Sequence, residues 1–246
     1  LYTMTGKSYN HIRIGAHFGT IDLGIELKHQ GWKYKLYRQS IFDTGSLFKV
    51  INYSDGLNGF SARRLPTSEG NPDYFVFQSF LLEVMSTKNQ INNHPDYELG
   101  IYRNGNYGNS FLYRNGWSYK GRMMGNPLFA PQASTVPGLP EYPTQFTNNN
   151  RILGIHSGIV ASMATTRFLF QGNYTMNYGT FFSPFETMKY QISLLLGVEK
   201  KLKNIKNTYL TMQIAADQGE LYPNTTGVNL GIKSGGLLDW RKEFVI

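Results

Sequence analysis

The segment Tyr190–Glu199, YQISLLLGVE, decides the fold of this 246-residue chain. Apolar side chains occupy every second position, and most of the positions between them are polar or small. Successive side chains of a β-strand point to opposite faces, so this period of two predicts a strand with one apolar and one polar face. The pattern recurs in 168–178, 210–217 and 228–233, with no helix of useful length between them. The sequence therefore predicts an all-β fold.

The N-terminal part of the chain shows the same alternation. The strands predicted there cover 11–18, 22–28 and 32–37. Gln30-Gly31 separates the last two and favours a tight hairpin turn. These three segments predict a meander of antiparallel strands.

The next region is less regular. Turn residues between Phe42 and Pro72 leave room for at most two short strands. Alternation then returns strongly over Tyr74–Met85, with Gln78 as an exception on the apolar face. Counted by alternation, the whole chain has about ten to twelve strands.

Both a β-sandwich and a β-barrel produce such alternation. Aromatic residues gather near the predicted strand ends, as the two interfacial girdles of a membrane barrel require. They are Tyr174, Tyr178, Phe181, Phe182, Phe185, Tyr190, Tyr209 and Tyr222. The second faces are small, amide-bearing or charged, which suits a polar lumen. We therefore predict a transmembrane antiparallel β-barrel over residues 1–246, with a soluble β-sandwich as the alternative.

Composition agrees with a chain whose surface is not that of an ordinary soluble domain. Charged residues make up 16% and aromatic residues 15%, whereas soluble domains carry about 25% charged residues. The net charge of +8 favours anionic partners such as lipopolysaccharide phosphates or acidic polysaccharide. The basic residues lack the dense clusters of a nucleic-acid footprint, so we predict no nucleic-acid partner. The absence of cysteine excludes disulfides, thiolate metal sites and cysteine nucleophiles.

Residues 89–150 form a long segment with little apolar period. Structureless loops longer than about 15 residues are usually functional or disordered. Abundant aromatic residues argue against disorder, because disordered tracts are poor in them. We predict an ordered excursion that folds onto or into the scaffold.

Within this excursion, Phe111–Pro131, FLYRNGWSYKGRMMGNPLFAP, interleaves aromatic with cationic side chains. Aromatic rings stack on sugars, while arginine and lysine hydrogen-bond uronate, phosphate or hydroxyl groups. The predicted polysaccharide-binding residues are Arg103, Tyr113, Arg114, Trp117, Tyr119, Lys120 and Arg122. Trp117 is the predicted stacking platform. The alternative is a packed irregular loop whose aromatics fill space and whose cations are solvated.

No catalytic or metal motif stands out in the sequence. The five histidines lack a metal-binding spacing such as HExxH, and a GxSxG elbow, a Walker loop and an SxxK pair are absent. Asp96 and Glu98 are a candidate carboxylate pair for glycoside cleavage. Their proximity in sequence does not establish the separation of about 5 to 9 Å that such cleavage needs. We therefore predict a protein that is not an enzyme and that uses no cofactor or metal.

Three short stretches resemble the capsule assembly Wzi family of outer-membrane proteins. They are TKNQ at Thr87–Gln90, IYRNG at Ile101–Gly105 and, above all, YRNGWSYKGRMMGNPLF at Tyr113–Phe129. The resemblance implies a C-terminal portion of a larger, 18-stranded barrel, within the range of strand numbers known for outer membranes.

The resemblance also implies a function. Such a protein lies in the outer membrane of a Gram-negative cell, binds capsular or other surface polysaccharide as a lectin, and helps retain or assemble it at the cell surface. Its partners are then acidic surface polysaccharide, outer-membrane lipid and lipopolysaccharide, and other outer-membrane proteins. The alternatives are a channel, a structural subunit of a larger outer-membrane complex and, third, a soluble β-rich glycan hydrolase.

Overall fold

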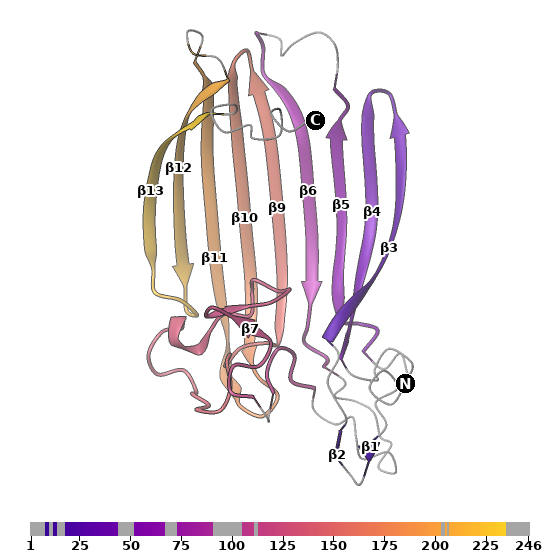
Figure 1. The fold of residues 1–246 in the computed structure, drawn as a ribbon, viewed down its shortest axis with the longest axis vertical. Helices are drawn as coiled ribbons and strands as arrows, with labels where there is room; N and C mark the ends of the chain where they lie inside the picture. Colours follow the sequence, from indigo (N-terminus) through magenta and orange to yellow (C-terminus); the bar gives the residue numbers. More distant parts are fainter. Residues whose placement is uncertain are drawn as a thin grey trace, which may run out of the picture.

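A computed structural model describes residues 8–9, 12–13, 18–43, 52–66, 73–90, 105–110, 113–202, 205 and 207–234. One antiparallel sheet of nine strands dominates it, in the order β13-β12-β11-β10-β9-β6-β5-β4-β3 (Figure 1). The strands are β3 (Phe18–His29), β4 (Trp32–Asp43), β5 (Gly56–Arg64), β6 (Val76–Ser86), β9 (Ile152–Met163), β10 (Thr166–Gly179), β11 (Pro184–Lys201), β12 (Thr208–Gly219) and β13 (Thr225–Ser234). The all-β prediction is confirmed.

Small elements accompany the sheet. β1 (Ser8–Tyr9) pairs with β2 (Ile12–Arg13), and β7 (Ser118–Tyr119) pairs with β8 (Arg122–Met123). One 3₁₀ turn covers Gln132–Ser134. No helix in the described ranges is long and apolar enough to cross a membrane.

The β3–β4 hairpin turns where the sequence predicts. Gln30 and Gly31 have φ values of 46° and 77°, and positive φ at both central residues defines the tight turn whose twist matches that of paired strands. The irregularity at Gln78 also has a structural counterpart, because the pairing of β6 with β9 shifts register between Phe77 and Ser79. Both signals were visible in the residue pattern.

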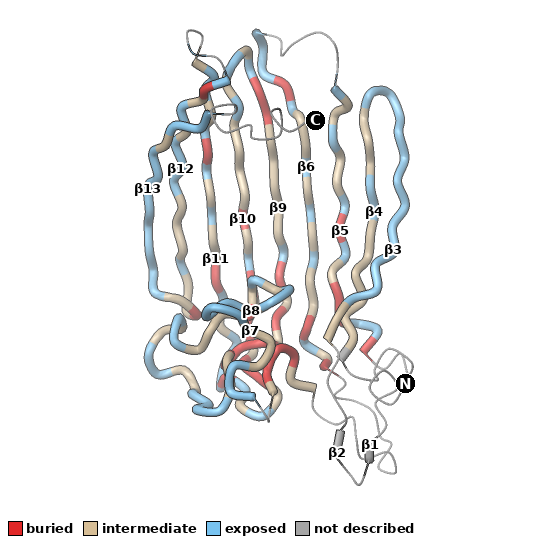
Figure 2. Tube along the Cα trace, in the orientation of Figure 1, coloured by how far each residue is buried: buried red, intermediate tan, exposed pale blue. Residues whose placement is uncertain are grey.

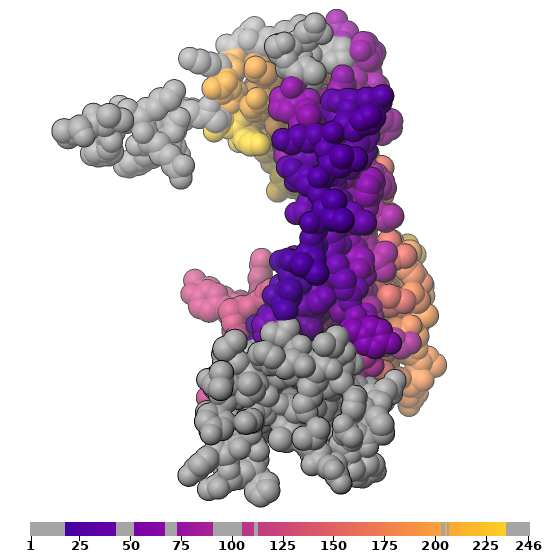
Figure 3. Space-filling model, turned by 90° about the vertical axis from the view of Figure 1, so that its right-hand side faces the viewer, coloured from indigo at the N-terminus to yellow at the C-terminus, as the bar shows by residue number. Residues whose placement is uncertain are grey.

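The register divides each strand between two faces. One face, called the outer face here, is apolar and exposed: Leu23, Ile25 and Leu230 keep 71%, 74% and 72% of their surface accessible. It also carries Ile21, Leu27, Leu36, Phe60, Leu82, Val84, Ile155, Leu194, Leu196, Val198, Leu210, Met212, Ile214, Val228 and Ile232. The opposite face, called the inner face, is mainly polar, and the sheet is curved so that residues of the 105–150 loop project from its hollowed side (Figure 3).

One transverse row of inner-face residues crosses all nine strands. In register order it consists of Gly24, Tyr37, Gly59, Glu83, His156, Asn173, Ser193, Asp217 and Thr225. No member is a large aliphatic residue. The outer-face neighbours of the row include apolar residues such as Val84 and Ile192, whereas Arg38 and Asn58 on β4 and β5 are polar.

Burial concentrates at one end of the molecule. Tyr107, Phe129 and Ile152 form a buried hydrophobic cluster, against which Phe18, Ile41, Met85, Met123 and Leu128 pack. Figure 2 shows most of the buried positions around the loop at this end, below the long strands. The described part of the protein is therefore held together by backbone pairing along the strands and by a compact core where the loop meets them.

Some sequence predictions differ from the structure. The strand β9 was not predicted, because Gly154, Ser157 and Gly158 interrupt its apolar pattern on both faces. Tyr209, predicted as part of a girdle, lies on the inner face, where Lys233 approaches its ring at 5.9 Å. The predicted strand over 11–18 is described only at Ile12–Arg13, which pairs with β1, and at Phe18, where β3 begins.

Candidate functional site

A buried polar cluster fixes the loop to the ends of the strands. Asp55, just before β5, accepts hydrogen bonds from the backbone N–H groups of Asn89 (3.0 Å) and Gln90 (2.7 Å). It also accepts one from the Tyr107 hydroxyl at 2.9 Å, and that hydroxyl in turn accepts one from the Asn52 amide at 2.8 Å. Burial raises the pKa of the Asp55 carboxyl above its ordinary value, although these donors act in the opposite direction.

Amide side chains extend the anchor. Asn150 donates to the Asn106 side chain at 2.6 Å and to the Tyr107 carbonyl at 2.9 Å, while Gln90 donates to the Asn150 carbonyl at 2.7 Å. Asn149 donates to Asn177 of β10 at 2.9 Å. Buried amides that hydrogen-bond to one another in this way hold loop backbone that has no sheet partner. The anchor therefore gives residues 105–110 and 113–150 a defined place on the scaffold.

The segment around Trp117 is shaped by two glycines. Gly116 has φ +50°, and a Cβ there would lie 2.1 Å from the Gly108 carbonyl oxygen. Gly108 itself has φ +79° and would bring a Cβ within 2.4 Å of the Met123 methyl group. Only glycine permits this close crossing of two backbone segments. Trp117 donates its backbone N–H to the Gly108 carbonyl at 2.8 Å. This hydrogen bond fixes the backbone position from which the indole side chain projects.

Three aromatic rings connect the anchor to a cavity. The Phe18 ring of β3 lies 5.7 Å from the buried Tyr107 ring and 6.2 Å from the Trp117 ring, centroid to centroid. The planes of the paired rings are inclined to each other by 44° and 42°, and such tilted arrangements are favourable for aromatic pairs. The indole is therefore positioned by packing and by its backbone.

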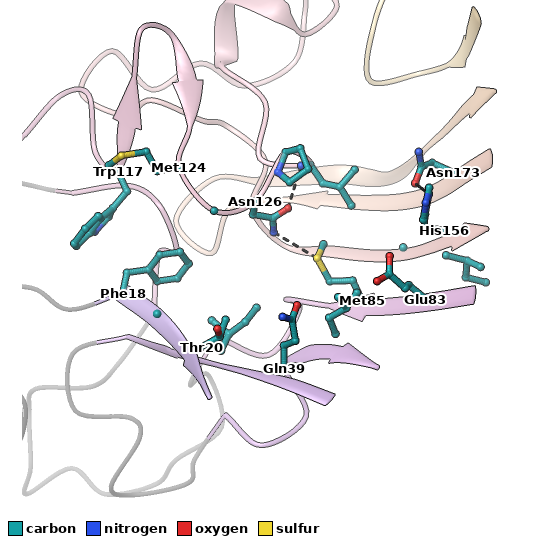
Figure 4. A pocket seen from close by; sticks show the side chains of 18 residues that line it. Phe18, Thr20, Gln39, Glu83, Met85, Trp117, Met124, Asn126, His156 and Asn173 are labelled. Atoms are coloured by element: carbon teal, nitrogen blue, oxygen red, sulfur yellow. Dashed lines mark hydrogen bonds between the residues drawn. The ribbon is translucent and has the colours of Figure 1, made fainter. Parts of the chain in front are cut away.

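The cavity lies between the loop and the inner face and has a volume of about 730 Å³. Its apolar wall is formed by Phe18, Ile41, Leu57, Met85, Trp117, Met124 and Leu128. Figure 4 shows Trp117 and Phe18 at one end of this wall and the polar groups Glu83, His156 and Asn173 at the other. A volume of this size falls in the range typical of small-molecule sites.

The polar wall is preorganised by contacts between strands. His156 Nδ1 lies 2.8 Å from the Asn173 side-chain oxygen, so the imidazole is oriented by its neighbour on β10. Tyr37 donates its hydroxyl to the Glu83 carboxylate across β5. This reach depends on Gly59, because a Cβ there would lie 2.2 Å from the Tyr37 ring. The cavity thus presents a carboxylate, an imidazole and an amide beside an aromatic wall.

Of the predicted site residues that the structure describes, Trp117 alone lines the cavity. Tyr113 and Tyr119 keep 70% and 66% of their surface exposed, and Arg114 donates to the Pro143 carbonyl at 3.0 Å. Lys120 stands 5.5 Å from the Tyr119 ring centroid at the tip of the β7–β8 hairpin. The predicted residues accordingly divide into a cavity residue and an exposed rim, which also includes Arg122.

Other predicted residues lie outside the described ranges, namely Arg103 and the candidate pair Asp96 and Glu98. Conversely, Glu83, His156 and Asn173 were not predicted as site residues, although all three lie on polar strand faces. β6 and β9 are separated in sequence by the long loop but pair in the sheet, and this pairing places Glu83 opposite His156. Spacing along the chain gives no signal for that contact.

The described residues include no group of three or more acidic, histidine or cysteine side chains arranged to hold a metal ion. The groups that line the cavity offer hydrogen bonding and stacking to a ligand. No family model, curated protein or solved structure matches the chain.

Proposed function

We propose that this chain is part of an outer-membrane β-barrel that binds acidic surface polysaccharide. The observation that carries the proposal is the contrast between the two faces of one sheet. Outer-face Leu23, Leu196 and Leu230 are exposed, in the pattern of a lipid-facing surface. In a soluble sandwich this face would be buried against a second sheet.

Aromatic residues add support at both ends of the outer face. Toward the β3–β4 turn, the rings of Trp32, Tyr34, Phe60 and Phe80 follow one another at centroid distances of 6.5, 6.5 and 6.4 Å. Toward the loop end lie Tyr174, Tyr190 and Phe182, each about two-fifths or more exposed. The eight residue steps from Tyr190 to Val198 correspond to about 26 Å of strand. The apolar band of a membrane barrel is about 25 Å tall.

The shortest turns and the longest loop favour one orientation, although the β5–β6 connection at the short-turn end has 11 residues. At one end the β3–β4 and β9–β10 turns have two residues each, Gln30-Gly31 and Ala164-Thr165, whereas the segment after β6 at the other end runs to Ile152 before a strand of the main sheet resumes. Outer-membrane barrels have short periplasmic turns and longer extracellular loops. In the proposal, the cavity and its rim therefore face the cell exterior.

Polysaccharide is the ligand class that suits this site best. An indole beside carboxylate, imidazole and amide groups offers stacking for a sugar face and hydrogen bonds for its hydroxyls. The exposed rim adds Lys120 and Arg122, which attract uronate or phosphate groups. Because the rim stands clear of the cavity, one sugar unit occupies the cavity while neighbouring units of a chain contact the rim.

The resemblance to the capsule assembly Wzi family agrees with this proposal. In the described residues β3 and β13 do not pair with each other, and the alternation of nine strands makes them run in the same direction. An antiparallel closure therefore requires an odd number of additional strands. An 18-stranded barrel supplies nine, so the sheet fits as one half of it.

A binding experiment tests the proposal. Trp117→Ala should weaken binding of the cell's own surface polysaccharide by about fivefold or more, since loss of a stacking aromatic costs roughly 1 to 3 kcal/mol. Arg122→Ala should weaken it less and mainly at low salt. Tyr142→Ala, an exposed loop aromatic outside the cavity lining, is the matched control. Unchanged binding in both test variants, with barrel assembly intact, would remove the loop from the function.

A structural subunit of a larger outer-membrane assembly is the second candidate. Among the described residues, the outer edges of β3 and β13 have no strand partner, and this favours the second candidate because exposed strand edges pair readily with other chains. A partner that stays bound through purification in detergent would support this reading. Its absence, together with polysaccharide binding, would favour the first.

A further inference from the structure

Three cationic residues stand directly opposite one another on the inner face, far from the cavity. Lys28 of β3 pairs with Lys33 of β4, and Lys33 pairs with Arg63 of β5. Directly opposed residues have Cβ atoms about 5 Å apart and share a face. We call these three residues the cation row.

The described surroundings of the cation row do not neutralise it. Lys33 forms an ion pair of 2.7 Å with Glu26, the acidic side chain one inner-face position away. Lys35, opposite Glu26, adds a further cation. On the next strand, β6, the residue opposite Arg63 is Ser79, which is neutral. Four cations thus face a single described acid on this part of the inner face.

Such an arrangement costs stability in the absence of a ligand. Like charges placed directly opposite in a sheet are destabilising, and the row lies where two-residue hairpin geometry fixes the register. The side chains cannot separate by sliding one strand along the next. Lys28, Lys35 and Arg63 are also exposed, so they are accessible to a solute on the hollowed side of the sheet.

We propose that the cation row is a second binding site, for a ligand that carries two or more carboxylate or phosphate groups. An acidic glycan is the ligand of this kind that the inner face fits, because it is extended, water-soluble and repeatedly charged, whereas lipid contacts the other face. Arg63 offers a bidentate fork and the two lysines offer point charges.

The cation row and the cavity lie at different heights of the same face. Tyr37 belongs to the same transverse row as the cavity residue Glu83. Lys33 is four residues from Tyr37 along β4, a distance of about 13 Å along the strand. The site therefore extends the proposed function toward the short-turn end, where a second stretch of the same acidic glycan would be held. It stands on its own observations, so its test is separable from that of the cavity.

Calorimetric titration of the full chain in detergent tests the row, with two probes, an oligogalacturonate and inorganic pyrophosphate. The wild-type protein should bind at least one of the two probes at low ionic strength, and this binding should disappear at high salt. Arg63→Gln should weaken that binding by about tenfold or more. The matched control is Arg64→Gln, the adjacent residue on the outer face, which pairs with Trp32 and should bind as wild type does. Binding of oligogalacturonate alone identifies a carboxylate ligand, and binding of pyrophosphate alone identifies a phosphate ligand.

A second readout separates binding from a structural role. Without a probe, Arg63→Gln should leave the thermal midpoint unchanged or raise it, because repulsion is relieved. The proposal is overturned if wild type binds neither probe, if Arg64→Gln loses as much affinity as Arg63→Gln, or if Arg63→Gln lowers the midpoint without changing affinity. Trp117→Ala should retain pyrophosphate binding. Loss of polysaccharide binding in Trp117→Ala with no effect of Arg63→Gln would refute the row and leave the cavity proposal standing.

Discussion

On β12, Ile214 lies on the outer face and its neighbour Gln213 on the inner face, and both are exposed. Exposure alone therefore does not distinguish the two faces; chemistry does. The outer face carries aliphatic or aromatic residues on all nine strands, while the inner face carries amides, acids and cations and holds the loop. An exposed apolar surface of this size marks a face that contacts a membrane or another protein. In the proposed barrel, the two faces contact two solvents, one apolar and one aqueous.

The largest expected effect comes from placing a charge on each face in turn. Ile214→Arg should destabilise the protein by about 2 to 4 kcal/mol if it lies near the middle of a bilayer. Gln213→Arg, one residue away, should change stability by no more than about 0.5 kcal/mol. Urea unfolding in lipid vesicles measures both. Equal losses in the two variants would remove the distinction between the faces.

A second pair of variants sharpens the account of the inner face. Gly59→Ala would place a Cβ 2.2 Å from the Tyr37 ring and displace the hydroxyl from Glu83. We expect a loss of about 1 to 3 kcal/mol, the usual cost of overpacking. Gly158→Ala is the control, since its Cβ would lie an ordinary 3.6 Å from Leu81. Similar losses at both positions would mean that a methyl group added anywhere on the inner face is destabilising. The contact between Tyr37 and Glu83 would then not depend on the missing side chain at Gly59 in particular.

A smaller effect concerns the anchor that joins the inner face to the loop. Tyr107→Phe removes the hydroxyl that donates to Asp55 and accepts from Asn52. Leaving these buried groups without that partner should cost about 1 to 2 kcal/mol. Limited proteolysis within the 113–150 segment should accelerate, while cleavage near the β3–β4 turn should not. Uniform acceleration would show that the anchor stabilises the entire sheet and not the loop in particular.

The smallest effect is a pH dependence of the same anchor. The pKa of Asp55 is raised in the folded protein, so its protonated form is favoured there more than in the unfolded chain. Its contribution to stability is then fully present below the unfolded pKa, near 3.8, and is lost as the pH rises through the higher folded pKa. Relative to Asp55→Asn, wild type should gain thermal stability as the pH falls from 7 toward 4. A wild-type loss relative to the variant over this range would reverse the assigned sign.

Much of the sheet was readable from the residue pattern because a half-exposed strand must alternate. The faces of β11 and β12, the Gln30-Gly31 turn and the irregularity at Gln78 all follow from spacing within a few residues. β9 was missed because Ser157 interrupts its apolar outer face between Ile155 and Ile159, and Gly154 and Gly158 contribute no side chain to its inner face.

The candidate site was less predictable. Aromatic and cationic residues in the loop identified Trp117, but the cavity wall opposite it is built from different strands. Glu83 and His156 meet through β6–β9 pairing, and Asn173 joins them from β10. The local sequence does not specify which strand will lie next to β6 in the sheet after a long loop. The cation row is hidden for the same reason, since Lys33 and Arg63 become neighbours only once β4 and β5 pair.

Fluorescence quenching at two adjacent residues of β11 tests the central claim most directly. Leu196 lies on the outer face and Leu195 on the inner face, and each is replaced by tryptophan in a background whose native tryptophans are phenylalanine. In vesicles, brominated acyl chains should quench Leu196→Trp strongly, and aqueous acrylamide should quench Leu195→Trp. Equal quenching of the two by brominated lipid, or stronger quenching at position 195, would contradict a lipid-facing outer surface.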